Sequence, residues 1–151
     1  MRRRLLCCAL VIASTLGSIG CDEALSDVTG PTPNLEPTFT SIQQEIFSSG
    51  DSSGRPACTQ CHNAVGSRFN GLDLSPAVSY GNLVNVASRE RPGVTRVLPN
   101  NPDSSYLVHK LEGTQASVGG GGNRMPLGAQ PLAGVEIQLI KDWIDQGAQD
   151  N

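Results

Sequence analysis

Cys58-Thr59-Gln60-Cys61-His62 is the stretch of this chain that says most about its fold and chemistry. The five residues read Cys-x-x-Cys-His, the attachment signature of a c-type haem. Two thiols at this spacing lie on one side of a helical turn, where each can form a thioether with a vinyl group of the macrocycle. The adjacent histidine can then bind the iron as proximal ligand. The motif therefore predicts one covalent haem c, bound by Cys58, Cys61 and His62.

Met125 is the first candidate for the second axial ligand of the iron. The chain has two methionines, and Met1 belongs to a leader segment. Met125 lies in a Pro-flanked loop, and its soft thioether suits reduced iron and raises the potential. The ordinary alternative for this residue is a filler of the hydrophobic core. An open sixth position is a further alternative, and the competing ligands are His109 and, more weakly, Lys110 and Lys141.

Two other interpretations of the Cys-x-x-Cys pair compete with the haem. A structural zinc site needs four ligands, and beyond the two cysteines only His62 and His109 remain as soft donors. A thioredoxin-like redox pair lies at a strand-to-helix junction in a βαβ pattern, which this sequence lacks. Both interpretations explain less of the chain than the haem does.

The N-terminal residues 1–20 have the sequence features of an export signal peptide. Arg2-Arg3-Arg4 precedes an apolar stretch that is too short to span a bilayer, which takes about 20 apolar residues. Ser18-Ile19-Gly20-Cys21 resembles a bacterial lipobox, which predicts lipidation of Cys21. The alternative is an ordinary signal peptide cleaved nearby, which would leave Cys21 as a free thiol. Lipidation predicts a protein anchored on the periplasmic side of a bacterial membrane.

Residues 21–37 are expected to form a flexible tether ahead of the domain at 38–151. The segment is rich in Pro, Ser, Thr and acidic residues and poor in large apolar ones. Such a coil spans on the order of 20–25 Å, which gives the domain reach from a membrane surface. An ordered extension packed on the domain is the alternative.

Short helices joined by long loops are predicted for the domain, which makes it all-α. The first begins at Thr40-x-x-Gln43, which fits a capping box, and Ile42 and Ile46 repeat on one face. The second begins at Ser75-Pro76, an N-cap and N1 pair, and runs to about Val86.

Two more helices follow in the C-terminal part of the chain. Asp103 or Ser104 is predicted to cap a short helix that Gly113 ends; its apolar residues are Tyr106, Leu107, Val108 and Leu111. The last helix runs from about Gly134 to Gln146, with Gly147 as C-cap. Its buried side is predicted to hold Val135, Ile137, Leu139, Ile140, Trp143 and Ile144. The glycine run at 119–122 between these helices is interpreted as slack that lets the Met125 loop reach across a haem.

Acidic residues outnumber basic ones in this chain. Lys and Arg number 11 against 14 Asp and Glu, and three of the arginines lie in the leader. A nucleic-acid partner needs clustered basic residues and is therefore disfavoured. Redox protein partners with a basic docking face are more compatible with this charge.

The motifs together resemble a small monohaem cytochrome c of class I type. They are particularly similar to the cytochrome c domains of large secreted and membrane-anchored proteins of planctomycetes and myxobacteria. The matching stretches include Gly71-Leu72-Asp73-Leu74-Ser75, Arg124-Met125-Pro126 and Ile140-x-x-Trp143-Ile144-x-x-Gly147-Ala148. The resemblance implies a fold of about four short helices wrapped around one haem, with His62 and Met125 as axial ligands. It further implies Leu72, Leu74 and Pro99 as haem-wall residues; Ala133-Gly134 departs from the usual Ser/Thr cap of the last helix.

Electron transfer is the function that these features predict, with haem iron cycling between Fe(II) and Fe(III). Two strong axial ligands would keep substrates from the iron, so we do not expect an enzyme. Di-haem peroxidases need a second Cys-x-x-Cys-His, and the chain has one. The alternative function is a haem-based gas sensor or ligand-binding module, in which Met125 is displaceable.

Overall fold

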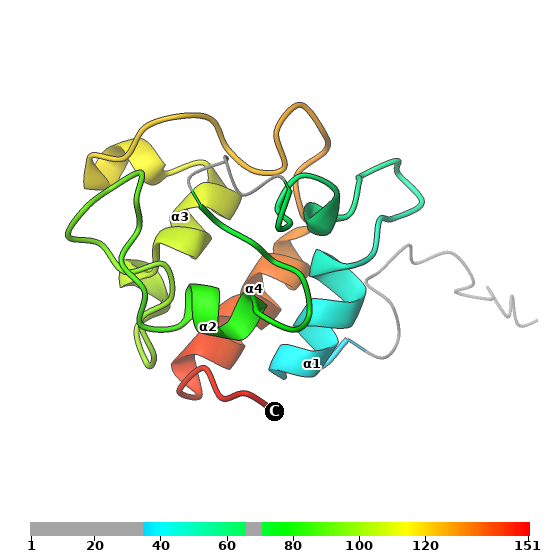
Figure 1. The fold of residues 1–151 in the computed structure, drawn as a ribbon, viewed down its shortest axis with the longest axis horizontal. Coiled ribbons are helices and arrows are strands. Elements are labelled where there is room, and N and C mark those ends of the chain that lie inside the picture. The colour runs from blue at the N-terminus through cyan, green and yellow to red at the C-terminus, as the bar shows by residue number, and fades with distance from the viewer. Residues whose placement is uncertain (1–34, 66–70) are drawn as a thin grey trace, which may run out of the picture.

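A computed structural model describes residues 35–65 and 71–151, and over these residues the chain is built from short helices and long loops (Figure 1). The α-helices are α1 (Phe39–Ile42), α2 (Ser79–Leu83), α3 (Tyr106–Glu112) and α4 (Gly134–Asp145). A π-helical segment (Gln43–Phe47) continues α1, and 3₁₀ turns occupy Cys58–Gln60, Pro102–Ser104 and Gln115–Val118. Within the described ranges extended pairing is limited to two isolated bridges, Val84 with Val97 and Ala87 with Thr95. The all-α prediction is confirmed.

The first helix was predicted correctly in place but not in its cap. Thr38, not Thr40, is the N-cap, and its hydroxyl accepts a 3.3 Å hydrogen bond from the Ser41 amide. The expected apolar face is present, because Ile42 and Ile46 are both fully buried. Starting the helix at Thr38 brings Phe39 into the first turn, where its ring joins the core.

Helix α4 supplies the opposite side of the same core. Its buried residues are Ile140, Trp143 and Ile144, as predicted, whereas Val135 is 48% exposed and that prediction was wrong. The missing Ser/Thr cap is partly replaced, because the Glu136 carboxylate accepts a 2.7 Å hydrogen bond from the Ala133 amide. The helix ends at Asp145 with Gln146 as its C-cap, one residue before the predicted Gly147, which follows at φ +98°.

Aromatic contacts join the N- and C-terminal helices. The Phe39 ring lies 5.4 Å from that of Trp143 and meets the Tyr80 ring edge-on at 5.2 Å. The Tyr80 hydroxyl donates to the Ala148 carbonyl at 2.9 Å, and the Trp143 indole donates to the Gln149 carbonyl at 2.8 Å. These bonds satisfy the polar ends of rings whose bodies are in the core, and they fix the chain beyond α4 against α1 and α2.

Helix α2 is shorter than predicted. Residues 76–78 form a turn ahead of the helix, and the Asp73 carboxylate accepts a 2.8 Å hydrogen bond from the Ser75 amide. The helix also stops before Val84, which is extended and bridges to Val97. β-branched residues at this end therefore pair with a neighbouring segment and do not extend the helix.

Helix α3 ends at Gly113 as predicted, with φ +81°. The predicted caps Asp103 and Ser104 are instead part of a 3₁₀ turn, which the Asn101 side chain caps by accepting from the Ser104 amide at 3.0 Å. Ser105 occupies the N-cap position of α3, and its hydroxyl bonds backward to the Asn101 carbonyl at 2.9 Å.

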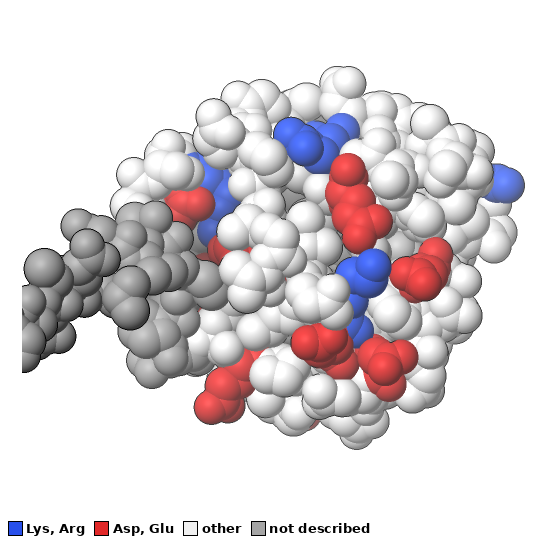
Figure 2. All heavy atoms as spheres, turned by 180° about the vertical axis from the view of Figure 1, so that it is seen from behind, with Lys and Arg blue, Asp and Glu red and all other residues white. Residues whose placement is uncertain are grey.

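The leader, Cys21 and most of the predicted tether lie outside the described residues. Within the described part of the chain, no helix is long and apolar enough to cross a membrane. On the face shown in Figure 2, basic side chains are scattered among more numerous acidic ones.

Candidate functional site

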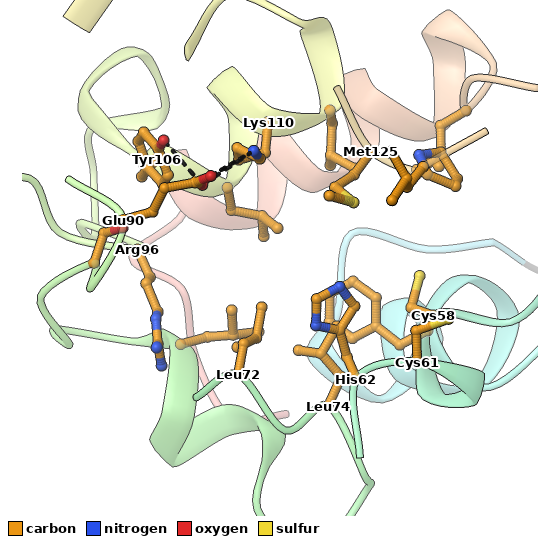
Figure 3. A pocket seen from close by; sticks show the side chains of 18 of the residues that line it. Cys58, Cys61, His62, Leu72, Leu74, Glu90, Arg96, Tyr106, Lys110 and Met125 are labelled. Carbon is orange, nitrogen blue, oxygen red and sulfur yellow. Dashed lines mark hydrogen bonds and ion pairs between the residues drawn. The ribbon is translucent and has the colours of Figure 1, made fainter. Parts of the chain in front are cut away.

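A largely apolar cavity of about 250 Å³ lies between the Cys-x-x-Cys-His turn and α3. Cys58, Cys61 and His62 line it on one side, and Met125 lines it on the other (Figure 3). Most of its remaining wall is aliphatic or aromatic: Phe47, Pro56, Ala57, Leu72, Leu74, Leu83, Tyr106, Leu107, Leu111, Pro126, Leu127 and Leu132. The structure therefore brings all four sequence-predicted cavity residues together.

The motif adopts a tight turn that directs its side chains to one cavity. Cys58–Gln60 is a 3₁₀ turn, and the Cys58 carbonyl accepts hydrogen bonds from the amides of Cys61 at 3.2 Å and His62 at 2.8 Å. The Leu74 amide donates to the His62 carbonyl at 2.9 Å and ties the turn to the Leu72–Leu74 wall. Both thiols are free; Cys58 is half-buried and Cys61 is exposed.

Burial shifts the pKa values of two residues of the motif, Cys58 and His62. It raises the pKa of the Cys58 thiol, and the positive charge of Arg55 opposes part of that rise. Burial also lowers the pKa of His62; a hydrogen bond with the Leu72 backbone opposes this shift. His62 is thus favoured as the neutral imidazole, which is the form that binds a metal.

Arg55 holds the segment that leads into the motif. Its guanidinium is buried and forms ion pairs with Asp51 at 3.0 Å and with Glu136 of α4 at 3.1 Å. Because Glu136 also caps α4, the approach to Cys58 is fastened to the start of the last helix.

Met125 lies in the loop between the 3₁₀ turn Gln115–Val118 and α4, and it is half-buried. Its amide donates a 2.8 Å hydrogen bond to the carbonyl of Lys110 on α3. The Met125–Pro126 peptide is cis. In Figure 3 the thioether of Met125 points into the cavity from the wall opposite the imidazole of His62.

Two of the three competing ligands, His109 and Lys141, lie outside the cavity. His109 does not line the cavity; its ring nitrogens lie 2.8 Å from the Thr114 hydroxyl and 3.1 Å from the Asp103 carbonyl. Lys141 is also outside the cavity, within 3.3 Å of the carboxylates of Asp103 and Glu112. Lys110 does line it, but its ammonium is paired with the Glu90 carboxylate.

The end of the cavity away from the cysteines is charged, which sequence reasoning did not anticipate (Figure 3). The Glu90 carboxylate forms an ion pair with the Lys110 ammonium at 3.0 Å. It also accepts a 3.1 Å hydrogen bond from the Tyr106 hydroxyl. Arg96 is buried beside them and donates to the Asn82 carbonyl at 2.7 Å. Exposed Arg89 also lines this end. The only sign of this charged end in the sequence is the run of charged residues at 89–91, which lies in a segment expected to be a connecting loop.

Of the three expected wall residues, Leu72 and Leu74 line the cavity and Pro99 does not. The Pro99 prediction was therefore wrong. The following amide, that of Asn100, donates to the Ile144 carbonyl at 2.8 Å, which directs this turn toward the end of α4.

Comparison of the chain with protein-family models, with curated proteins and with solved structures finds no match. Among residues 35–65 and 71–151, no three His, Cys, Asp or Glu side chains gather as a ligand set for a metal ion. The site is therefore interpreted from its own geometry. Two free thiols at this apolar cavity could bond to the vinyl groups of a haem, and the imidazole and the thioether could bind its iron.

Proposed function

We propose that this chain is a small c-type cytochrome of class I-like fold that transfers electrons through one covalent haem. The observation that carries the proposal is the convergence of Cys58, Cys61, His62 and Met125 on a single apolar cavity. In this proposal the N-terminal helix α1 and the C-terminal helix α4 form the core behind the haem.

The chemistry of the cavity lining supports the proposal of a haem. The two thiols at one end would form the thioethers, and the aliphatic walls would cover the macrocycle. At the other end three cationic side chains, Arg89, Arg96 and Lys110, line the cavity against the single carboxylate of Glu90. That excess of two positive charges complements the two propionate carboxylates of a haem.

The bound haem would supply a one-electron Fe(III)/Fe(II) couple. His62 would hold the iron through a neutral imidazole, which burial favours. Met125 would close the opposite side with a soft sulfur, which favours the reduced ion. The apolar walls at Leu72 and Leu74 would keep water away, so that little reorganisation accompanies electron transfer.

The contacts of Met125 favour an electron carrier over the alternative function, a haem-based gas sensor. A sensor needs a sixth ligand that leaves readily. The Met125 amide is instead bonded to the Lys110 carbonyl at 2.8 Å, which fixes the residue to α3. Two filled axial positions also leave no coordination site for a substrate, so the proposal does not include an enzyme activity.

The proposed location is the periplasmic side of a bacterial membrane. Residues 1–20 would direct export, lipidated Cys21 would anchor the chain, and residues 21–37 would tether the domain. The proposed partners are redox proteins that donate and accept electrons. The net charge of the whole chain is −3, which favours partners with a basic docking face.

The test is a redox titration of residues 22–151 produced in an exporting host with c-type haem maturation. We expect covalent haem that titrates reversibly as a single one-electron couple. The matched control is the double variant Cys58→Ser with Cys61→Ser, which should carry no covalent haem. A parent chain that acquires no covalent haem would contradict the proposal.

A further inference from the structure

The loop that carries Met125 contains four consecutive glycines, and although most of it is exposed, two of these glycines lie against other side chains. This loop, residues 119–125, is here named the Met125 loop. A Cβ at Gly120 would collide with the hydroxyl and ring of Tyr106, and one at Gly122 would lie 2.5 Å from a carboxylate oxygen of Glu90. Gly121 differs, because a Cβ there meets nothing within 4 Å. Two of the four glycines thus allow the loop to approach other side chains, which the expectation of slack did not include.

Lys110 of α3 connects this loop to Glu90. Its ammonium lies 3.3 Å from the Gly121 carbonyl and 3.0 Å from the Glu90 carboxylate. Its own carbonyl accepts the 2.8 Å hydrogen bond from the Met125 amide. One residue of α3 thus binds the loop at two points and the Glu90 segment at a third.

Tyr106 and Glu90 complete the arrangement. The Tyr106 hydroxyl donates to Glu90 at 3.1 Å, on the same carboxylate that pairs with Lys110 (Figure 3). The Lys110 and Glu90 side chains are 11% and 20% exposed, so solvent screens their ion pair only in part. Glycine-rich segments lose much conformational freedom on ordering, and such contacts are what offset that loss.

We propose that Glu90, Tyr106 and Lys110 form a clamp that positions Met125 and keeps the sixth coordination position of the iron closed. The three act through the loop and are positioning residues. This inference rests on the proposed function and assigns to the charged end of the cavity a role in holding the axial ligand. Releasing the clamp makes the Met125 sulfur displaceable without removing it.

The first test compares Gly120→Ala with Gly121→Ala in the haem-loaded protein. The substitutions are identical and adjacent, but only the first places a methyl group against Tyr106. Gly120→Ala should weaken the near-infrared methionine-to-iron band of the oxidised protein and speed CO binding to the reduced protein by about tenfold or more. Gly121→Ala should match the parent. Equal behaviour of the two variants would overturn the clamp.

The second test removes the negative charge of Glu90 and keeps the shape of its side chain. Glu90→Gln should reproduce the faster CO binding, and Glu112→Gln is the control because Glu112 pairs with Lys141 outside the cavity. Haem content and far-ultraviolet circular dichroism confirm that each variant is loaded and folded. If Gly120→Ala fails to fold, Glu90→Gln and Tyr106→Phe decide the question.

The outcomes separate the clamp from the function on which it rests. A parent without the methionine-to-iron band would contradict His/Met ligation, and the clamp with it. A parent with the band, whose CO binding is unchanged by Glu90→Gln and Tyr106→Phe, would overturn the clamp alone.

Discussion

His62 and Met125 line opposite walls of one cavity, the imidazole on one side and the thioether on the other (Figure 3). The two residues are held in place by different segments of the chain. His62 follows the tight turn at Cys58–Gln60, whereas Met125 is bonded through its amide to Lys110 on α3. Because α3 also packs against α4, the spacing of the two walls depends on the helical core. The core therefore determines which ligands can face one another.

The two motif thiols should differ in reactivity before a haem is attached. Cys58 is half-buried, and burial raises its pKa, whereas Cys61 is exposed. Since the thiolate is the nucleophile, iodoacetamide should alkylate Cys61 first in haem-free protein of residues 22–151. Mass spectrometry of the peptides measures the order.

The haem-loaded protein is the control for this labelling. Neither thiol should react there, because both would be in thioether bonds. Labelling of Cys58 or Cys61 in protein with a full haem content would contradict covalent attachment through that residue.

Arg89 at the charged end of the cavity should raise the redox potential. A nearby positive charge destabilises the oxidised iron more than the reduced iron, so Arg89→Gln should lower the midpoint potential. Because Arg89 is exposed, we expect a shift on the order of tens of millivolts that shrinks as salt increases.

Lys141→Gln is the matched control, since it removes the same charge from outside the cavity. Potentiometric titration of both variants measures the effect. A potential that rises in Arg89→Gln, or that falls equally in Lys141→Gln, would show that the charged end does not act on the iron.

Asp51 should contribute an acid-sensitive part of the stability. The pKa of its carboxyl is lowered from 3.8 to about 2, first by a hydrogen bond from Ser53 and further by bonds from Arg55. A lowered native pKa means that the unfolded chain takes up the proton more readily. The contribution is therefore complete above pH 3.8 and is lost as the pH falls through about 2.

Urea unfolding of the parent and of Asp51→Asn across this range measures that contribution. The parent should lose more stability on acidification than the variant, so the two midpoints should converge. A difference between them that stays constant with pH would exclude Asp51 as the source.

Much of the helical pattern and all four cavity residues were predictable, because each has a local signal. Cys58, Cys61 and His62 form a motif, and Ile140 and Trp143 lie at helical spacing on the buried side of α4. The coarse all-α class follows from the same periodicity. Such signals are short-range, and the contacts that satisfy them lie within a turn or two of the residue.

The charged end of the cavity was not predictable, because its parts come together only through tertiary contacts. Glu90, Tyr106 and Lys110 belong to two separate segments, and a charged residue in a loop usually indicates a solvated surface. The role of Gly120 was hidden for the same reason, since its sequence context indicates flexibility while Tyr106 requires the absence of a side chain. Predictions of helix ends were also wrong where a side chain formed a competing hydrogen bond with the backbone. At Ser75, for example, the amide donates to the Asp73 carboxylate.

The most direct test of the central claim is the absorption spectrum of haem-loaded residues 22–151, beside that of Met125→Ala. The oxidised parent should show a near-infrared methionine-to-iron band, and the reduced parent should bind CO slowly. In Met125→Ala the band should vanish and CO should bind readily. A parent without the band that binds CO as fast as Met125→Ala would contradict His62/Met125 ligation and the electron-transfer function built on it.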